Sequence, residues 1–371
     1  MRCAAPSSGC WRRPEERRRA MVRIIPLGGL GEIGLNMMVF ESGGSAIVVD
    51  AGLMFPEDYM LGVDFVIPDL SYIRSNKPRI QGVVLTHAHE DHIGALPFLL
   101  REIDVPVFGT PFTLGLVQQK LTELEMNAPA GLHTISPDDP LKLGDFSLDF
   151  IRVGHSVVDG VGIAIDTPEG LIVHTGDFKI SRSDGGQGTD VRKFARCGER
   201  GVLALLSDST NVEREGSTLP DSRVGETMTQ ILEASTGRII VALFASNIGR
   251  IQMIVDIARA AGRKVIISGR SIEASAEIAK RLGHLVIPRD TEVSIDLVQD
   301  FADEEVVIVT TGSQGEPMSA LARMAAGTHK QIRIKPGDTV VLSSKFIPGN
   351  ERAIAKIIDS LYRRGADVVY E

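Results

Sequence analysis

The segment Thr86–His92, with the sequence Thr-His-Ala-His-Glu-Asp-His, offers several potential metal ligands within one short stretch. His87 and His89 alternate after an apolar, strand-like run, so an extended backbone points both imidazoles to the same side. Asp91 and His92 follow where a helical pattern begins, and they can face a second ion. Imidazole and carboxylate ligands without thiolate suit Zn²⁺ or Mn²⁺ at a catalytic site. The segment therefore predicts a catalytic metal centre.

Two later segments place one further ligand type each at the end of a predicted strand. His155 follows the run that ends at Val153, and Asp177 follows Leu171–His174. Singly, a histidine is more often a core or surface residue, and an aspartate is a common turn residue. Together with the earlier segment they supply a third imidazole for one ion and a carboxylate that could bridge two ions.

The elements that must position these ligands follow two different patterns along the chain. The first half is rich in strands, whereas the second half alternates helices with buried strands, which is typical of a parallel sheet with crossover helices. The polar stretch Glu213–Ser222 is the predicted boundary, which gives domains of 21–215 and 216–371. The expected strands are Val22–Leu27, Met37–Phe40, Ala46–Asp50, Gly82–Thr86, Pro106–Phe108, Phe146–Val153, Gly162–Asp166, Leu171–His174, Arg238–Leu243, Lys264–Ser268, Val306–Thr310 and Thr339–Ser343. The expected helices are Ile93–Glu102, Thr227–Ala234, Ile251–Ala261 and Ile272–Arg281.

A glycine-rich motif, Gly29-Leu-Gly31-Glu-Ile-Gly34, follows the first strand and matches the dinucleotide-binding fingerprint. Asp50 lies about twenty residues further on, where a ribose-binding acid would sit. The fingerprint requires a helix after the glycines, but the next residues predict two strands around Gly43 and Gly44. The glycines are therefore expected to shape a tight loop at the mouth of a site.

Composition sets limits on the class of protein. The 371 residues carry a net charge of −8, so a nucleic-acid ligand would need metal ions or a locally basic groove to offset that charge. No apolar run is long enough for a membrane-spanning helix. Three scattered cysteines, Cys3, Cys10 and Cys197, fit a reducing cytosol and a cytoplasmic location. The basic residues 1–20 lack the apolar core of a secretory signal and are interpreted as a disordered leader or a start codon placed too early, with Met21 as the true start.

The ordered set of motifs is similar to the metallo-β-lactamase superfamily, and most of all to bacterial ribonuclease J of the β-CASP branch. The likeness covers about residues 22–371. The segments that carry it are Gly28–Gly34, Asp50–Gly52, Phe55–Asp58, His87–His92, His174–Phe178, Ser207–Asn211, Phe244–Asn247, Thr311–Pro317 and Pro348–Asn350.

This resemblance implies an αββα metallo-β-lactamase domain with an inserted β-CASP α/β domain. It implies two Zn²⁺ ions, with Mn²⁺ as an alternative, and 5′→3′ exonuclease and endonuclease action on RNA by a hydroxide that the ions activate. It also implies RNA as the partner, and a homo-oligomer (dimer or tetramer) or an RNA-decay complex for the full-length protein. Phe55–Asp64 is a candidate for a structural Ca²⁺, as in relatives.

The same resemblance assigns roles to single residues. His87, His89 and His155 would bind one ion, Asp91 and His92 the other, and Asp177 would bridge them. Asp91 would also orient the attacking hydroxide, and Asp208 would match the acidic motif that opens the β-CASP region and act in catalysis. Polar residues near strand ends of the second domain are candidates for substrate binding: Ser246, Asn247, Arg250, Ser313 and Lys345.

One departure from the family's pattern concerns the C-terminus. Two histidine-containing segments, the C-terminal domain and the last strands of the metallo-β-lactamase fold would lie beyond Glu371 in the family. The chain is therefore interpreted as a C-terminally truncated relative whose second ion lacks one ligand.

Two classes of alternative function stay open. A DNA nuclease or a small-ester metallo-hydrolase of the same superfamily would use the same ligands, and cleavage of matched RNA and DNA distinguishes the nucleases. A non-catalytic, truncated subunit is the other alternative, and it would purify without metal.

Overall fold

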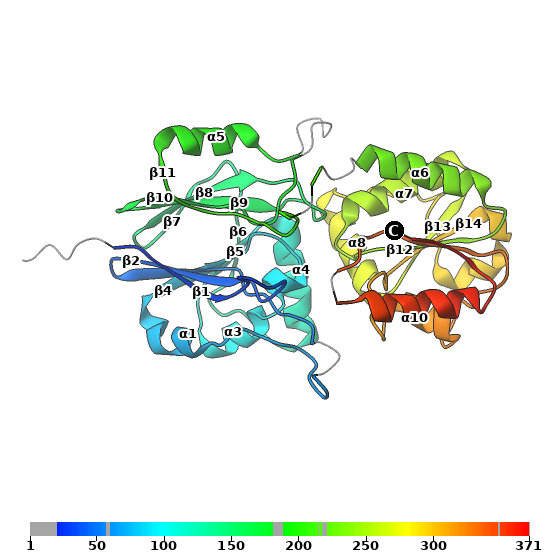
Figure 1. Cartoon of the computed structure of the whole chain (residues 1–371), viewed down its shortest axis with the longest axis horizontal. Coiled ribbons are helices and arrows are strands. Elements are labelled where there is room, and N and C mark those ends of the chain that lie inside the picture. Colours follow the sequence, from blue (N-terminus) through cyan, green and yellow to red (C-terminus); the bar gives the residue numbers. More distant parts are fainter. Residues whose placement is uncertain are drawn as a thin grey trace, which may run out of the picture.

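The computed structural model describes residues 21–56, 60–180, 188–213, 215–216, 221–347 and 349–370. The predicted leader, residues 1–20, lies outside this description, as do residues 57–59 of the candidate Ca²⁺ segment and residues 214 and 217–220 at the predicted boundary. Figure 1 shows two lobes side by side, the first built by β1–β11 and the second by α6–β16. The change from one lobe to the other lies between β11 and α6.

Two facing β-sheets form the centre of the first lobe. They share a core of fully buried side chains that includes Phe40, Ile47, Phe146 and Phe150. The first sheet has the order β1-β2-β3-β4-β5-β6, with the bounds Arg23–Gly28, Met37–Ser42, Ser45–Val49, Ile80–Val84, Val107–Gly109 and Leu132–Thr134. The second has the order β11-β10-β9-β8-β7, with the bounds Val202–Leu206, Gly170–His174, Val161–Thr167, Phe146–Arg152 and Leu141–Leu143.

Helices cover the outer faces of both sheets, which gives the four layers that Figure 1 shows in the left lobe. Ile73, Leu99 and Val117 pack from the helices onto the first sheet, and Cys197 packs onto the second. The αββα arrangement expected from the resemblance is therefore confirmed. The helices are α1 (Ser71–Asn76), α2 (Glu90–Ile93), α3 (Leu96–Glu102), α4 (Pro111–Glu123) and α5 (Val191–Arg200), with a 3₁₀ turn at Lys77–Arg79.

The second lobe is a parallel sheet of order β13-β14-β12-β15-β16. Successive strand residues point to opposite faces, so Val241 and Val309 meet α7 and α8, whereas Ile240 and Ile308 meet α9 and α10. The strands are β12 (Ile239–Ala242), β13 (Lys264–Ser268), β14 (Val306–Thr310), β15 (Thr339–Leu342) and β16 (Asp367–Tyr370). The helices are α6 (Asp221–Ala234), α7 (Ile248–Ala260), α8 (Arg270–Leu282), α9 (Ala320–Ala326) and α10 (Glu351–Tyr362), with 3₁₀ turns at Ile295–Asp300 and Asp303–Glu305.

The glycine-rich loop after β1 leads directly into strand β2 and not into the helix that a dinucleotide-binding motif requires, as the sequence predicted. Gly29, Gly31 and Gly34 adopt positive φ angles. At Gly29 a Cβ would lie 2.6 Å from the side-chain oxygen of Asn36, so the loop folds tightly over that residue. The motif therefore builds a turn beside the metal-ligand loop.

Helix α4 was not predicted, because its environment hides the usual helical pattern. Phe112, Leu114 and Val117 are buried, and Gly115 faces Ile278 of α8, where a Cβ would lie 2.7 Å away. The helix is thus covered by both lobes and lacks a clear polar face. Among the described residues, no helix has the length and apolar character needed to cross a lipid bilayer.

Candidate metal centre

The loop Leu85–His89, between β4 and α2, carries the first two histidines of the centre. The backbone of Asp50 donates to the carbonyl of Val84 at 2.9 Å, and the backbone of Thr86 donates to the Asp50 carboxylate at 2.8 Å. These bonds fix the loop at the carboxyl end of β4. His89 is extended (φ −74°, ψ 151°) and directly precedes α2, so the chain turns into a helix just after the two alternating histidines.

Two loops from the second sheet complete the centre. His155 lies between β8 and β9, and Asp177 follows β10. The backbone of Lys179 donates to the carbonyl of Gly154 at 2.7 Å, which ties the two loops to each other. The ligands thus come from both sheets of the sandwich, and they lie next to the second lobe, since the His89 ring centroid is 6.5 Å from that of Phe244.

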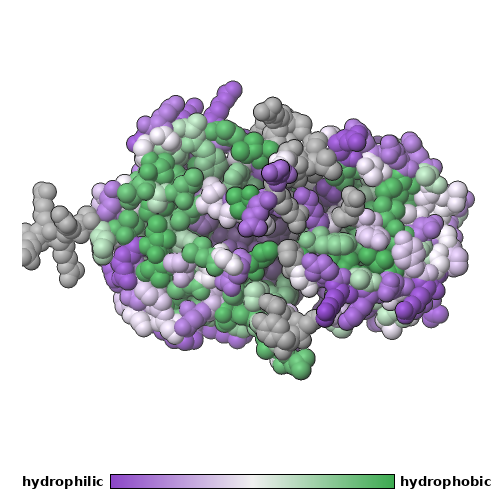
Figure 2. Space-filling model, in the orientation of Figure 1, coloured by the Kyte–Doolittle hydropathy of each residue, from purple (hydrophilic) through white to green (hydrophobic). Residues whose placement is uncertain are grey.

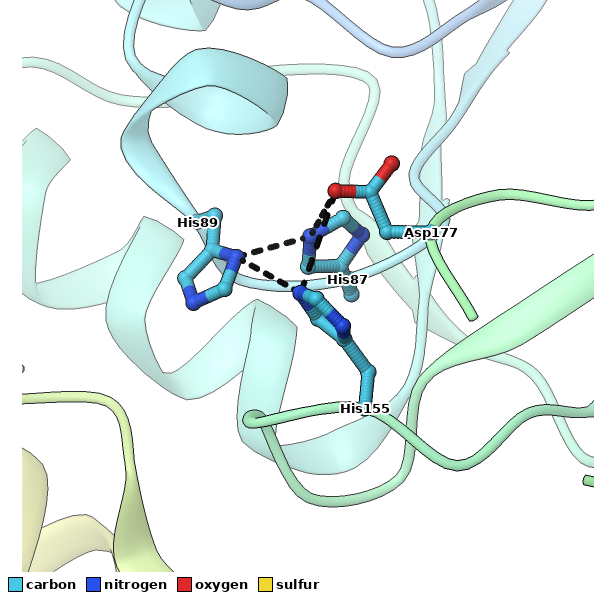
Figure 3. A group of neighbouring side chains, drawn as sticks. All are labelled: His87, His89, His155 and Asp177. Carbon is cyan, nitrogen blue, oxygen red and sulfur yellow. Dashed lines mark hydrogen bonds and ion pairs between the residues drawn. The ribbon is translucent and has the colours of Figure 1, made fainter. Parts of the chain in front are cut away.

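One ligand atom from each of His87, His89, His155 and Asp177 lies within 4.8 Å of the other three. Figure 3 shows the three rings and the carboxylate turned toward a common point. The His89 Nδ1 atom lies 3.0 Å from His87 Nε2 and 3.2 Å from His155 Nε2. One carboxylate oxygen of Asp177, Oδ2, lies 3.9 Å from His87 Nε2 and 3.8 Å from His155 Nε2. Three imidazoles and a carboxylate converging in this way fit a divalent metal ion such as zinc.

His92 and Asp91 lie beside this group and face the other oxygen of the same carboxylate. His92 Nε2 is 3.5 Å from Asp177 Oδ1 and 3.7 Å from Asp91 Oδ2. The carboxylate of Asp177 therefore presents one oxygen to His87 and His155 and the other to His92. All six ligand residues expected from the sequence are brought together by the fold.

Burial and the neighbouring charges set the protonation of these groups. Burial, reinforced by His155 and His92, lowers the pKa of His89 to about 3. Burial also lowers the pKa values of His87 and His155, so these rings are neutral at pH 7 and offer lone pairs. Burial alone would lower the pKa of His92, but the Asp91, Asp50 and Asp177 carboxylates outweigh it and raise that pKa. The two parts of the centre thus differ in charge.

Two residues that the sequence did not mark as part of the site hold His92 and Asp91 in place. The Nδ1–H of His92 donates to the buried Asp50 carboxylate at 2.8 Å. The Nδ2 of Asn36 lies 3.1 Å from His92 Nε2 and 3.4 Å from Asp91 Oδ2. The signal for Asp50 was present, since an aspartate ends a buried strand, but the spacing from the glycines suggested a ribose contact instead.

Comparisons with known proteins agree with this geometry. Residues 30–193 match the model of the metallo-β-lactamase superfamily, and residues 236–361 match the model described as "Ribonuclease J, beta-CASP domain". The chain belongs to the ribonuclease J branch of the metallo-β-lactamase superfamily.

Two curated ribonucleases J illustrate the relationship. The chain is 43% identical to a ribonuclease J of Helicobacter pylori over 355 residues, which is 95% of this chain and 51% of that protein. It is 45% identical to a ribonuclease J of Thermus thermophilus over 357 residues, which is 94% of this chain and 62% of that protein. The chain thus spans between half and two thirds of the length of these relatives.

A crystal structure of an Enterococcus faecalis protein of unknown function shares the fold. Its TM-score is 0.66 at 14% sequence identity, and the match covers 95% of this chain and 87% of that chain. At this identity the similarity concerns the fold alone.

In this ribonuclease J relative, Asp208 lies just after β11, next to the metal ligands but outside their group. Its backbone amide donates to the Thr175 hydroxyl at 3.0 Å, and its carboxylate accepts from the Thr210 hydroxyl at 2.7 Å. The charge of Asp208 acts on His155, where it partly offsets the lowering of that pKa by burial.

The five predicted substrate-binding residues all follow the carboxyl ends of strands in the second lobe, but their environments differ. Asn247 caps α7 by accepting from the Arg250 amide at 3.1 Å, and an Nη of Arg250 donates to Ser343 at 2.9 Å. Ser246 and Lys345 are partly or fully exposed. Ser313 is 1% exposed, and its hydroxyl has no hydrogen-bond partner among the described residues, so this side chain lies beneath the surface.

Proposed function

We infer that this chain is a zinc-dependent ribonuclease that hydrolyses RNA phosphodiesters, acting as a 5′→3′ exonuclease and as an endonuclease in RNA processing and decay. The observation that carries this proposal is the Asp177 carboxylate, which directs Oδ2 toward His87 and His155 and Oδ1 toward His92. A carboxylate whose two oxygens face two neighbouring groups of ligands suits a pair of metal ions of the kind that two-ion hydrolases use.

The residues divide into two ligand sets. His87, His89 and His155 would hold one zinc ion, and Asp91 and His92 would hold the other. Asp177 would bridge the ions, and Mn²⁺ suits the same nitrogen and oxygen donors. Two bound ions supply activation of water and stabilisation of negative charge at phosphorus.

The chain's own residues orient and tune these ligands. Asp50 accepts the Nδ1 proton of His92, so Nε2 is the nitrogen that would release its proton and offer its lone pair when an ion binds. Asp91 would have a second role, in which its carboxylate orients the attacking water. Asp208 places a carboxylate close enough to His155 to raise that pKa, and we assign it a role in proton transfer during the reaction.

The large second lobe supports a polymeric substrate. Figure 2 shows a hollow in the surface between the two lobes, with hydrophilic residues in it. We assign RNA to this hollow, with Ser246, Asn247, Arg250 and Lys345 as candidate contacts. We further place the protein in the cytoplasm, in a dimer, a tetramer or an RNA-decay complex. A structural Ca²⁺ at Phe55–Asp64 stays a prediction.

The test measures metal content and RNA hydrolysis on the same purified protein. Near two zinc ions per chain together with hydrolysis of a labelled RNA support the proposal, and His89→Ala should lose both an ion and the activity. The exposed His133, whose Nε2 contacts the Ala130 carbonyl at 3.0 Å, provides the matched control His133→Ala. Protein that carries no metal and leaves RNA intact would instead be a non-catalytic subunit.

A further inference from the structure

The contact between the two lobes is built by helix α4 of the first lobe and helix α8 of the second. Figure 1 shows these helices side by side at the boundary between the lobes. Gly115 of α4 faces Ile278 of α8 so closely that a Cβ at Gly115 would lie 2.7 Å from the Ile278 side chain. Phe112 at the start of α4 and Ala88 in the metal-ligand loop are buried in the same core as Ile278. One shared core therefore spans the boundary.

The loop 154–160, which connects β8 to β9, reaches from this shared core to the metal centre. Val157 is 3% exposed and belongs to the shared core, two residues after the ligand His155. The carboxylate of Asp159 accepts two hydrogen bonds at the beginning of α4 and lies 3.8 Å from Nε2 of His284 in the second lobe. The position of this loop thus depends on both lobes.

The same loop contacts all three histidines proposed for one ion, here called the first ion. It carries His155 itself. The Ser156 hydroxyl lies 3.3 Å from Nε2 of His89, which keeps Nδ1 of that ring directed toward the other ligands. Gly160 packs against His87, since an added Cβ would lie 3.5 Å from the Cβ of His87. A shift of the loop would therefore disturb every nitrogen ligand of the first ion.

The ligands proposed for the other ion, here called the second ion, are supported within the first lobe. His92 contacts Asp50 and Asn36, and Asn36 also contacts Asp91. Ile93, which follows His92, is buried in a core that consists of first-lobe residues. The two ions should therefore differ in how strongly their binding depends on the second lobe.

We propose that the contact between the lobes positions the ligands of the first ion, so that packing of the lobes and binding of this ion stabilise each other. Val157 and Ile278 are the positioning residues. The proposal rests on the assignment of the metal centre made under the proposed function. Coupling between two equilibria is reciprocal, so the factor by which packing raises the affinity for the ion is also the factor by which the ion favours packing.

The experiment measures zinc affinities by titration with a competing chelator. His155→Ala and His92→Ala identify which affinity belongs to the first ion and which to the second. Gly115→Ala pushes α4 away from α8 and should weaken the first ion by about tenfold while the second ion keeps its affinity. The matched control is Gly198→Ala in α5, whose added methyl group meets open space. Alanine favours a helix over glycine at both positions, so both variants should fold.

A second pair of variants separates positioning from a general loss of stability. Ile278→Ala removes packing from the shared core, whereas Ile354→Ala in α10 removes packing from the other core of the second lobe. Both should lower the Tm. Only Ile278→Ala should also weaken the first ion, again by about tenfold.

The reciprocal effect is measured by amide hydrogen exchange with and without zinc. Zinc should slow exchange in α4 of the parent, because α4 is covered by both lobes and opens less often when they stay packed. Helix α10, which packs in the other core, is the internal reference and should exchange at the same rate in both conditions. His155→Ala should abolish the slowing in α4.

The outcomes distinguish this proposal from the nuclease assignment. A first-ion affinity that falls in Gly115→Ala and Ile278→Ala, but not in Gly198→Ala and Ile354→Ala, supports the coupling, even if the parent leaves RNA intact and the nuclease assignment fails. If the parent binds two zinc ions and hydrolyses RNA but the contact variants keep its first-ion affinity, the coupling is wrong and the nuclease assignment stands. An equal fall in both affinities would also contradict the coupling. If the parent binds no zinc, both proposals fall together.

Discussion

The carboxylate of Asp50 lies 2.8 Å from Nδ1 of His92, and both side chains are buried. The same carboxylate accepts from the Thr86 amide and hydroxyl, so it links the end of β4 to the start of α2. Asp50 thereby decides that Nε2 of His92 is the nitrogen turned toward Asp91 and Asp177. A carboxylate behind a histidine of this kind is as much a part of the metal centre as the ligands.

Replacing Asp50 should therefore weaken the binding of one metal ion more than that of the other. Asp50→Asn keeps the shape and suits the positive φ of 61° at this position, but it removes the charge behind His92. We expect the affinity for the ion at Asp91 and His92 to fall by roughly 10–100-fold, with the ion at His87, His89 and His155 retained. Zinc titration with a competing chelator measures both affinities. Two unchanged affinities would contradict the role of Asp50.

Gly52 is required by a close backbone approach next to the same residues. A Cβ at this position would overlap the carbonyl oxygen of Asp91 and lie 2.9 Å from the Asn36 amide. Gly52→Ala must therefore displace the loop that carries Asp91, which should lower both stability and zinc content. The control Gly44→Ala places its methyl group in open space. Metal analysis and thermal unfolding should give a lower zinc content and a lower Tm for Gly52→Ala than for Gly44→Ala. Equal values for the two variants would show that the loop accommodates the added methyl group without loss of stability.

Zinc should stabilise the folded chain, because the ligands converge only when both sheets are formed. A ligand that binds the native state at about 100 times its Kd adds about 2.7 kcal/mol to the free energy of unfolding. We expect zinc to raise the Tm of the parent by several degrees, and His155→Ala to lose most of that gain. Differential scanning calorimetry with and without a chelator is the measurement. An equal Tm with and without zinc would contradict zinc binding at this centre.

Asp159 should be important for the contact between the lobes. Its carboxylate accepts from the Thr110 hydroxyl at 2.8 Å and from the Phe112 amide at 3.0 Å, at the beginning of α4. It also lies 3.8 Å from His284 of the second lobe. Asp159→Ala removes a cap and should cost about 1–2 kcal/mol, whereas Asp159→Asn, which tolerates the φ of 53°, should cost less. Urea unfolding of the two variants tests this order.

His329 should make the free energy of unfolding of the chain depend on pH. Burial, with a smaller effect of Arg323, lowers the pKa of His329, and its Nδ1 accepts from the Ile332 amide at 3.1 Å. The unfolded chain therefore takes up this proton at a higher pH than the folded chain. Stability from this group is present above about pH 6.5 and is lost as pH falls below it, with a slope of at most about 1.4 kcal/mol per pH unit.

Removing this histidine should make that dependence weaker. We expect His329→Gln to show a smaller loss of stability than the parent between about pH 7.5 and about pH 5.5, because one proton uptake by the unfolded chain is gone. Urea unfolding at several pH values gives the slope. Parallel curves for parent and variant would show that His329 titrates equally in both states.

Local sequence determined the ligands and the strands that carry them. His87, His89, Asp91 and His92 lie within one loop, so chain geometry alone brings them together. The parallel sheet of the second lobe was equally predictable, because strands such as Ile239–Ala242 and Val306–Thr310 are continuous apolar runs that only a sheet covered on both faces explains.

Only the tertiary structure decided which distant residues meet. Helix α4 escaped prediction because two lobes cover it, and Asn36 and Asp50 join the centre through contacts with Asp91 and His92, far along the chain. Ser313 lies beneath the surface although its polar loop suggested exposure. A cavity at the carboxyl ends of β12 and β14 arises because these two strands are neighbours in the sheet although they are distant in the sequence. Spacing along a chain fixes short-range geometry, whereas burial and long-range contacts depend on how the elements pack.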